Sequence, residues 1–134
     1  MTTTLNEEQR NKLVEWMADR RVDTDIDSQE RTHRMELLAG LGEAHVREMA
    51  GKEGIELTDE HLGVVECLRD YYLELGEAEN GRDLEEMLDE IFAGHGGRKY
   101  LWRLFPGGPV TQGMRLAGLP LPPHTGDKGF GTVR

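Results

Sequence analysis

The single cysteine of this 134-residue chain, Cys67, is its only thiol. A lone cysteine forms no disulfide within the chain and supplies no zinc site of the multi-cysteine kind. If its segment is helical, Cys67 lies about 110° from the centre of that helix's apolar face, beside Glu66 and Asp70. Neighbouring carboxylates disfavour the thiolate and raise the pKa of a thiol. We therefore expect Cys67 to be half-buried and unreactive.

Histidines and glycines offer the next candidates for chemistry. Glu30 and His33 have the E-x-x-H spacing of di-metal sites in helical bundles, but such sites need a second motif and two further carboxylates. The stretches GHGGRK and GFG match neither phosphate-binding pattern, G-x-x-x-x-G-K-[ST] or G-x-G-x-x-G. His61 is expected to pack or to form hydrogen bonds at the start of its helix. We predict no metal site and no cofactor.

The charge of −10 is unevenly distributed along the chain. Residues 1–94 hold 25 acidic and 10 basic side chains, whereas residues 95–134 hold six basic side chains and one acidic one. Such asymmetry often marks a binding end, although a basic tail could equally neutralise the acidic body. Trp102 lies among these basic residues. Its ring could anchor a partner protein, or it could pack in the core of this chain. The candidate partner-binding residues are Arg98, Lys99, Trp102, Arg103 and Arg115.

The elements that position these residues are predicted to be helices. Apolar residues recur at helical spacing in nearly all of the chain before residue 95. A first helix is expected to be capped by Thr4 and Glu7 and to end near residue 21, a second to begin near Asp27, and a third to cover 43–50. Thr58 and Gly76 bound the clearest helix. Further helices are expected over 84–93, 98–105 and 109–117, and no strand, so that the fold class is all-α with five to seven helices.

The composition of the last part of the chain predicts a C-terminal arm. From residue 119 onward there are three prolines and three glycines, and Phe130 is almost the only residue suited to a core. We predict one domain overall, made of an N-terminal segment (1–53), a helical core (54–118) and a flexible C-terminal arm (119–134). The sequence shows no secretory signal and no apolar run of about 20 residues, which predicts a cytoplasmic protein.

Two long motifs resemble those of a known family. "LTDEHLGVVECLRDYY" and "KYLWRLFPGGPVTQGMRLAGLPLP" resemble the DsrC/TusE family of small sulfur-relay proteins, which includes the type called the gamma subunit of dissimilatory sulfite reductase. The resemblance covers roughly residues 54–126, and residues 1–53 do not resemble the family's usual N-terminal strands. It implies a compact helical domain with a helix-turn-helix-like element and a flexible arm. It also implies partners of the sulfite-reductase, sulfur-transfer or tRNA-thiolation kind.

The chain departs from the family at the cysteines that carry sulfur. The resemblance places a second arm cysteine at Met114 and the terminal cysteine at about Asp127, and neither side chain carries sulfane sulfur. The chain thus resembles cysteine-less regulatory members, and we expect a non-catalytic interaction protein. Two alternatives stay open: DNA binding through Asp83–Gly118, which the acidic body disfavours, and sulfur transfer through Cys67. The sequence does not decide whether the chain is an enzyme, but the missing cysteines argue against sulfurtransferase activity.

Overall fold

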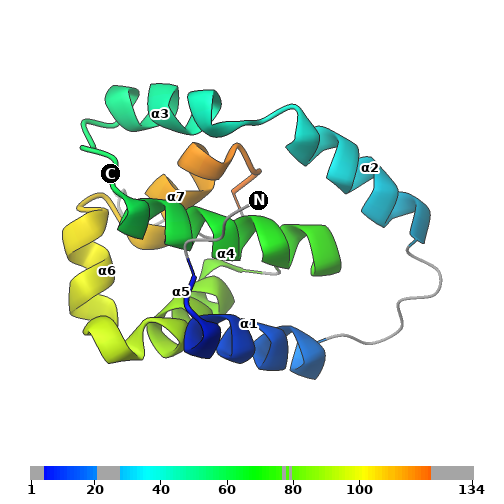
Figure 1. Ribbon diagram of the computed structural model, residues 1–134, viewed down its shortest axis with the longest axis horizontal. Coiled ribbons are helices and arrows are strands. Elements are labelled where there is room, and N and C mark those ends of the chain that lie inside the picture. The colour runs from blue at the N-terminus through cyan, green and yellow to red at the C-terminus, as the bar shows by residue number, and fades with distance from the viewer. Residues whose placement is uncertain (1–4, 21–27, 77, 79, 122–134) are drawn as a thin grey trace.

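The computed structural model describes residues 5–20, 28–76, 78 and 80–121 (Figure 1). Within these ranges the chain forms seven α-helices and one short 3-10 turn, and it forms no strand, which confirms the predicted all-α class. The elements are α1 (Glu7–Arg20), α2 (Ser28–Ala39), α3 (Glu43–Lys52), α4 (Asp59–Leu75), α5 (Gly81–Ile91), η2 (Ala93–His95), α6 (Arg98–Leu104) and α7 (Pro109–Ala117).

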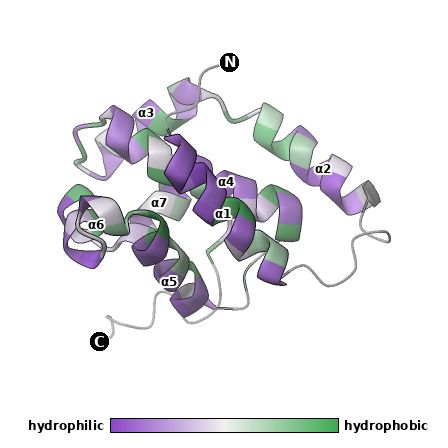
Figure 2. Ribbon diagram, turned by 60° about the horizontal axis from the view of Figure 1, so that its bottom comes forward, coloured by the Kyte–Doolittle hydropathy of each residue, from purple (hydrophilic) through white to green (hydrophobic). Residues whose placement is uncertain are grey.

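Helix α4 is the central element. It packs against α1, α2, α5 and α7, and it runs through the middle of the view in Figure 1. The closest of these packings is with α7, where Gly113 faces α4: a Cβ atom added at Gly113 would lie 2.8 Å from Cδ1 of Leu68. Each helix carries both hydrophobic and hydrophilic residues (Figure 2). Burial of the apolar sides in one core, against α4 and between the neighbouring pairs α1–α5 and α3–α7, supplies the main stabilising free energy of the fold.

The ends of α4 confirm the sequence prediction. The Thr58 side chain accepts a hydrogen bond from the backbone N–H of His61, and the His61 side chain accepts one from the backbone N–H of Thr58. This reciprocal pair is a capping box in which histidine takes the place of the usual glutamate or glutamine. Gly76, with a φ of 83°, ends the helix where an L-residue would be strained. Local chemistry alone therefore determines where α4 begins and ends.

Helix α1 begins differently from the prediction. The Asn6 side chain accepts from the backbone N–H of Gln9 at 2.7 Å, and the Gln9 side chain accepts from that of Asn6 at 3.0 Å. Asn6 is therefore the N-cap in place of Thr4, which lies outside the described residues, as does Asp27 before α2. Asparagine and threonine are both good N-caps, so composition alone did not separate the two positions.

Two ion pairs tie the N-terminal helices to α4. Arg10 of α1 binds Glu66 at 2.6 Å, and Arg31 of α2 binds Glu74 at 2.7 Å. Glu66 and Glu74 lie two turns apart on α4, and Asp70 lies between them at the i+4 position. The described part of residues 1–53 is thus joined to the same core as the rest of the chain.

Helix α7 ends in the arrangement that the sequence predicts. Gly118 is left-handed (φ 78°, ψ 26°), its N–H bonds to the carbonyl of Arg115, and the next N–H, of Leu119, bonds to that of Met114. These two bonds form a Schellman motif. Leu119 is buried, whereas Leu121 is 39% exposed. Residues 122–134, with the predicted flexible arm and Asp127, lie outside the described residues.

Among the described residues, no helix has both the length and the apolar character that crossing a membrane requires. The cytoplasmic location and the division at residues 53 and 118 stay predictions.

Candidate functional site

Cys67 is fully buried, so the prediction of a half-buried side chain was wrong. Its exposed fraction is 0%. The reason is that α4 is covered on several sides, by α1 and α2 as well as by α5 and α7, so burial extends well beyond its apolar face. Burial raises the pKa of the thiol first, the charges of Asp70 and Glu66 raise it further, and Arg10 opposes them. Cys67 is therefore held as a neutral thiol with no access to solvent.

The exposed side of α6 brings four of the predicted partner-binding residues together. Arg98, Lys99, Trp102 and Arg103 are all exposed and span about 140° of the helix, and we call them the α6 basic face. Trp102 has an exposed fraction of 44%, which is high for an indole. Tyr100, on the opposite side, is buried.

The charges of the α6 basic face are largely uncompensated. Arg98 makes a long ion pair with Asp89 at 3.5 Å, in which the Arg98 side chain is 67% exposed. No carboxylate whose side chain the structure describes lies within 4 Å of Lys99 or Arg103. Exposed pairs such as Arg98–Asp89 contribute little energy, so the face presents its positive charge to solvent.

The turn between α6 and α7 supports Trp102. Gly108 has a φ of 111°, a conformation that favours glycine, and a Cβ atom added there would lie 3.6 Å from the outer ring carbon Cη2 of Trp102. Phe105, at the end of α6, is fully buried. The indole therefore lies on a short helix that is anchored at its C-terminal end.

Arg115, the fifth predicted partner-binding residue, lies in a different contact. Its Nη1 is 3.3 Å from Oε1 of Glu53, beyond the end of α3. The same Glu53 oxygen accepts from Nε2 of Gln112 at 3.2 Å, and Oε1 of Gln112 accepts from the backbone N–H of Gly107 at 2.9 Å. Arg115 thus helps to join α7 to α3 and does not share the α6 basic face.

Met114 is a core residue with an exposed fraction of 4%. Its thioether has no proton to lose, and so it cannot act as a nucleophilic thiolate. Close to it, Nε of Arg69 donates to the carbonyl of Ala117 at 3.0 Å, at the C-terminal end of α7. Burial lowers the pKa of Arg69. These contacts fix the start of the arm and offer no group for sulfur chemistry.

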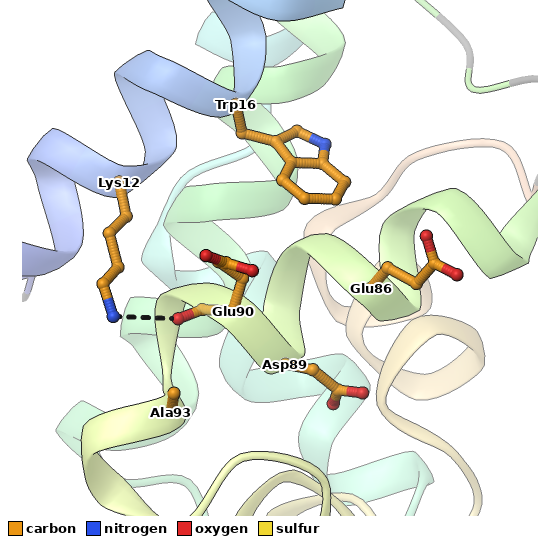
Figure 3. A pocket seen from close by; sticks show the side chains of 6 residues that line it. All are labelled: Lys12, Trp16, Glu86, Asp89, Glu90 and Ala93. Atoms are coloured by element: carbon orange, nitrogen blue, oxygen red, sulfur yellow. Dashed lines mark hydrogen bonds between the residues drawn. The ribbon is translucent and has the colours of Figure 1, made fainter.

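A groove between α1 and α5 was not foreseen from the sequence. It has a volume of about 500 Å³ and is lined by Lys12, Trp16, Glu86, Asp89, Glu90 and Ala93 (Figure 3). Its two walls are about seventy positions apart in the chain, so no local motif describes it. The available signals were the i, i+3, i+4 spacing of the three acidic residues on α5 and a tryptophan on a predicted first helix.

Metal and DNA sites receive no support from the described residues. His33 and Glu30 are exposed on α2, and no group of three potential metal-ligating side chains occurs in the part of the chain that the structure describes. In the segment proposed for DNA binding, η2 and α6 lie between α5 and α7. The helix-turn-helix-like element and the absence of cofactors stay predictions.

Comparison with known proteins identifies the family of the chain. The family described as "DsrC like protein" matches residues 22–125, more than three quarters of the chain. The sulfurtransferase TusE of Escherichia coli (strain K12) and that of Salmonella typhimurium are each 43% identical over 75 residues, which is 55% of this chain and 69% of the relative. No solved structure matches. The matched residues contain α2 to α7, the α6 basic face and the start of the arm, and the chain belongs to the DsrC/TusE family of DsrC-like proteins.

Proposed function

We propose that this chain is a non-catalytic interaction or regulatory protein of sulfur metabolism that docks on sulfur-relay proteins through the α6 basic face. One observation carries the proposal: an exposed tryptophan lies among largely uncompensated cations on α6, inside the family match, whereas the one cysteine is inaccessible. The chain keeps a surface for recognition without a group that could carry sulfur.

The composition of the α6 basic face suits a protein partner. Tryptophan and arginine are the residues that most often dominate the binding energy of interfaces, because a large ring or a planar guanidinium buries much area at low entropic cost. The positive charge favours a partner with an acidic surface, and it would accelerate their encounter at low salt. The partner we propose is therefore an acidic protein surface with an apolar recess for the Trp102 ring.

The absence of carrier chemistry follows from the side chains at the relevant positions. Accepting a sulfane sulfur requires a thiolate that can reach the donor. Cys67 is buried and neutral, Met114 is a thioether, and the position that the family resemblance gives to the terminal cysteine is Asp127. A protein with this surface could occupy the docking site of a cysteine-bearing relative and compete with it.

The sulfur-relay proteins of the source organism provide the test of docking. Binding to each immobilised component should be measured for the full chain, together with competition against a cysteine-bearing DsrC-like protein. Trp102→Ala should weaken binding by about tenfold or more, as expected for a central anchor. Arg103→Glu should also weaken it, whereas Arg82→Glu, an equal charge reversal at an exposed position on α5, should not. Binding no tighter than that of an unrelated acidic protein would refute the proposal.

A separate measurement addresses sulfur transfer through Cys67. The folded protein should be incubated with a persulfide donor, alkylated and analysed by mass spectrometry. We expect Cys67 to remain without added sulfur. A persulfide on Cys67 would favour the carrier alternative over the proposal.

A further inference from the structure

We propose that the groove between α1 and α5 binds a lysine- or arginine-bearing segment of a partner protein. The groove is defined by the six residues named above, and we call it the α1–α5 groove. This inference goes beyond the docking function of the α6 basic face, because it concerns a different surface of opposite charge.

The shape and the walls of the groove suit a long cationic side chain. About 500 Å³ of space lies between the two helices, enough for one or two extended side chains. Figure 3 shows the Trp16 ring projecting from α1 over α5, with the carboxylates of Glu86 and Asp89 on the α5 side. An aromatic ring beside carboxylates attracts cations through its negative face and through direct charge pairing. The methylene stem of lysine or arginine can lie along the ring.

The carboxylates of the groove are available to a ligand. Glu86 and Glu90 are exposed, and no cation whose side chain the structure describes lies within 4 Å of either carboxylate. Asp89 has a partner in Arg98, but at 3.5 Å and with a largely exposed guanidinium. A cation of the partner could therefore pair with Glu86 and Glu90 without displacing any described ion pair.

A cation of the chain itself already lies at one end of the groove. The Nζ atom of Lys12 donates to the backbone carbonyl of Glu90 at 3.2 Å (Figure 3), and it lies 3.6 Å from Oε2 of Glu8. This end of the groove thus holds an alkylammonium group through a carbonyl and a carboxylate. The Glu86 carboxylate and the Trp16 ring line the same groove, and a carboxylate beside an aromatic ring suits a ligand of the same chemical class.

The N-terminal helix makes the groove an addition to the family core. The family match begins at residue 22, so α1, with Lys12 and Trp16, lies outside it. Helix α1 is nevertheless firmly placed, since Leu13 is buried and Arg10 binds Glu66. A cationic segment is the occupant that charge complementarity favours, because residues 1–94 carry 25 acidic against 10 basic side chains.

A fluorescence titration can test the groove. Trp16 and Trp102 are the two tryptophans of the chain, so the Trp102→Phe variant leaves Trp16 as the reporter. The probe is a blocked peptide with four lysines separated by alanine and glycine, and the reference is the same peptide with glutamine in place of lysine. We expect the lysine peptide to change Trp16 emission saturably at low salt, and more weakly at 0.5 M salt, where the Debye length falls to about 4 Å. The glutamine peptide should have no effect.

Matched variants distinguish binding in the α1–α5 groove from general attraction by the negative charge of the chain. Glu86→Gln with Glu90→Gln should weaken binding about fourfold, since each exposed charge pair contributes roughly a factor of two. Glu36→Gln with Glu56→Gln removes the same charge at exposed positions outside the groove and should leave affinity unchanged. Equal losses in the two double variants, or no binding, would overturn the proposal. Self-association of the chain that depends on Glu86 and Glu90 would also overturn it, by making a second copy the occupant.

Discussion

The side chain of His61 joins the start of α4 to the end of α6: its Nε2 lies 2.8 Å from the carbonyl oxygen of Leu104. Nδ1 accepts a hydrogen bond from the backbone N–H of Thr58 at 3.1 Å, so the proton is on Nε2, which donates to Leu104. The ring of Phe105 meets the imidazole edge-on, with centroids 5.0 Å apart. One residue therefore caps α4 and also fixes the helix that carries the α6 basic face.

Replacement of His61 should destabilise the whole protein. His61→Ala removes the cap from Thr58 and leaves the carbonyl of the half-buried Leu104 without its donor, and it deletes a ring that packs against Phe105. We expect the free energy of unfolding to fall by about 2–4 kcal/mol, measured by urea denaturation with circular dichroism. His33→Ala, at an exposed position on α2, should change it by less than about 0.5 kcal/mol. Similar effects of the two substitutions would contradict the bridging role.

The acidic row on α4 predicts a pH dependence. The pKa of Asp70 is raised from its ordinary value of 3.8 to about 6, chiefly by burial and in part by the charges of Glu66 and Glu74, and the charge of Arg10 opposes this rise. The folded protein therefore holds the Asp70 proton more tightly than the unfolded chain does. The contribution of Asp70 to stability is therefore most favourable below about pH 4, where Asp70 is protonated in both states, and it is lost as pH rises from about 4 to about 6.

Asp70→Asn should remove this loss of stability. Because Asp70 is only partly buried, we expect a gain of about 1 kcal/mol at pH 7, well below the full value that its pKa implies. The gain should vanish near pH 4. Thermal unfolding of the two proteins between pH 4 and pH 8 measures the effect, with Glu36→Gln on the exposed side of α2 as the control. A gain that is independent of pH would show that charge at Asp70 is not its cause.

The features that were predictable from the sequence are those that depend on local chemistry. Thr58, Gly76 and Gly118 bound their helices as expected, because capping needs only the few residues around each helix end. The exposure of Trp102 was not among these predictable features, because its place among cations was compatible both with a partner anchor and with ordinary packing. Helical spacing was sufficient to predict the all-α class, because it also depends only on residues that are close together in the sequence.

The features that were missed depend on packing between distant segments. A helical wheel placed Cys67 at the side of one apolar face, but it could not show that α1 and α2 cover α4 from other directions. The α1–α5 groove likewise exists only because Trp16 comes to lie beside Glu86 in the folded chain. Spacing shows the acidic row on α5 and the side of α4 on which Cys67 lies, but it does not show which distant segment packs against either one.

Gly118 should tolerate no side chain at the start of the arm. A Cβ atom there would lie 2.7 Å from Cδ1 of Leu41 and 3.1 Å from Nε2 of His45, and the left-handed backbone would add strain. We expect Gly118→Ala to lower the free energy of unfolding by about 2 kcal/mol or more. Gly94→Ala, where a Cβ atom would meet nothing within 4 Å, should be nearly neutral. Equal stability of both variants in urea denaturation would contradict this account.

The burial of Cys67 predicts a thiol that reacts only when the protein opens. We expect it to react with an aromatic disulfide reagent at pH 8 roughly a thousandfold more slowly in the folded protein than in guanidinium, which corresponds to an opening free energy of about 4 kcal/mol. In the Glu36→Cys variant the thiol introduced on exposed α2 should react at once, so the time course should show one fast and one slow phase. If both thiols react at the same fast rate, Cys67 is accessible to solvent. Its burial would then no longer argue against sulfur transfer through Cys67.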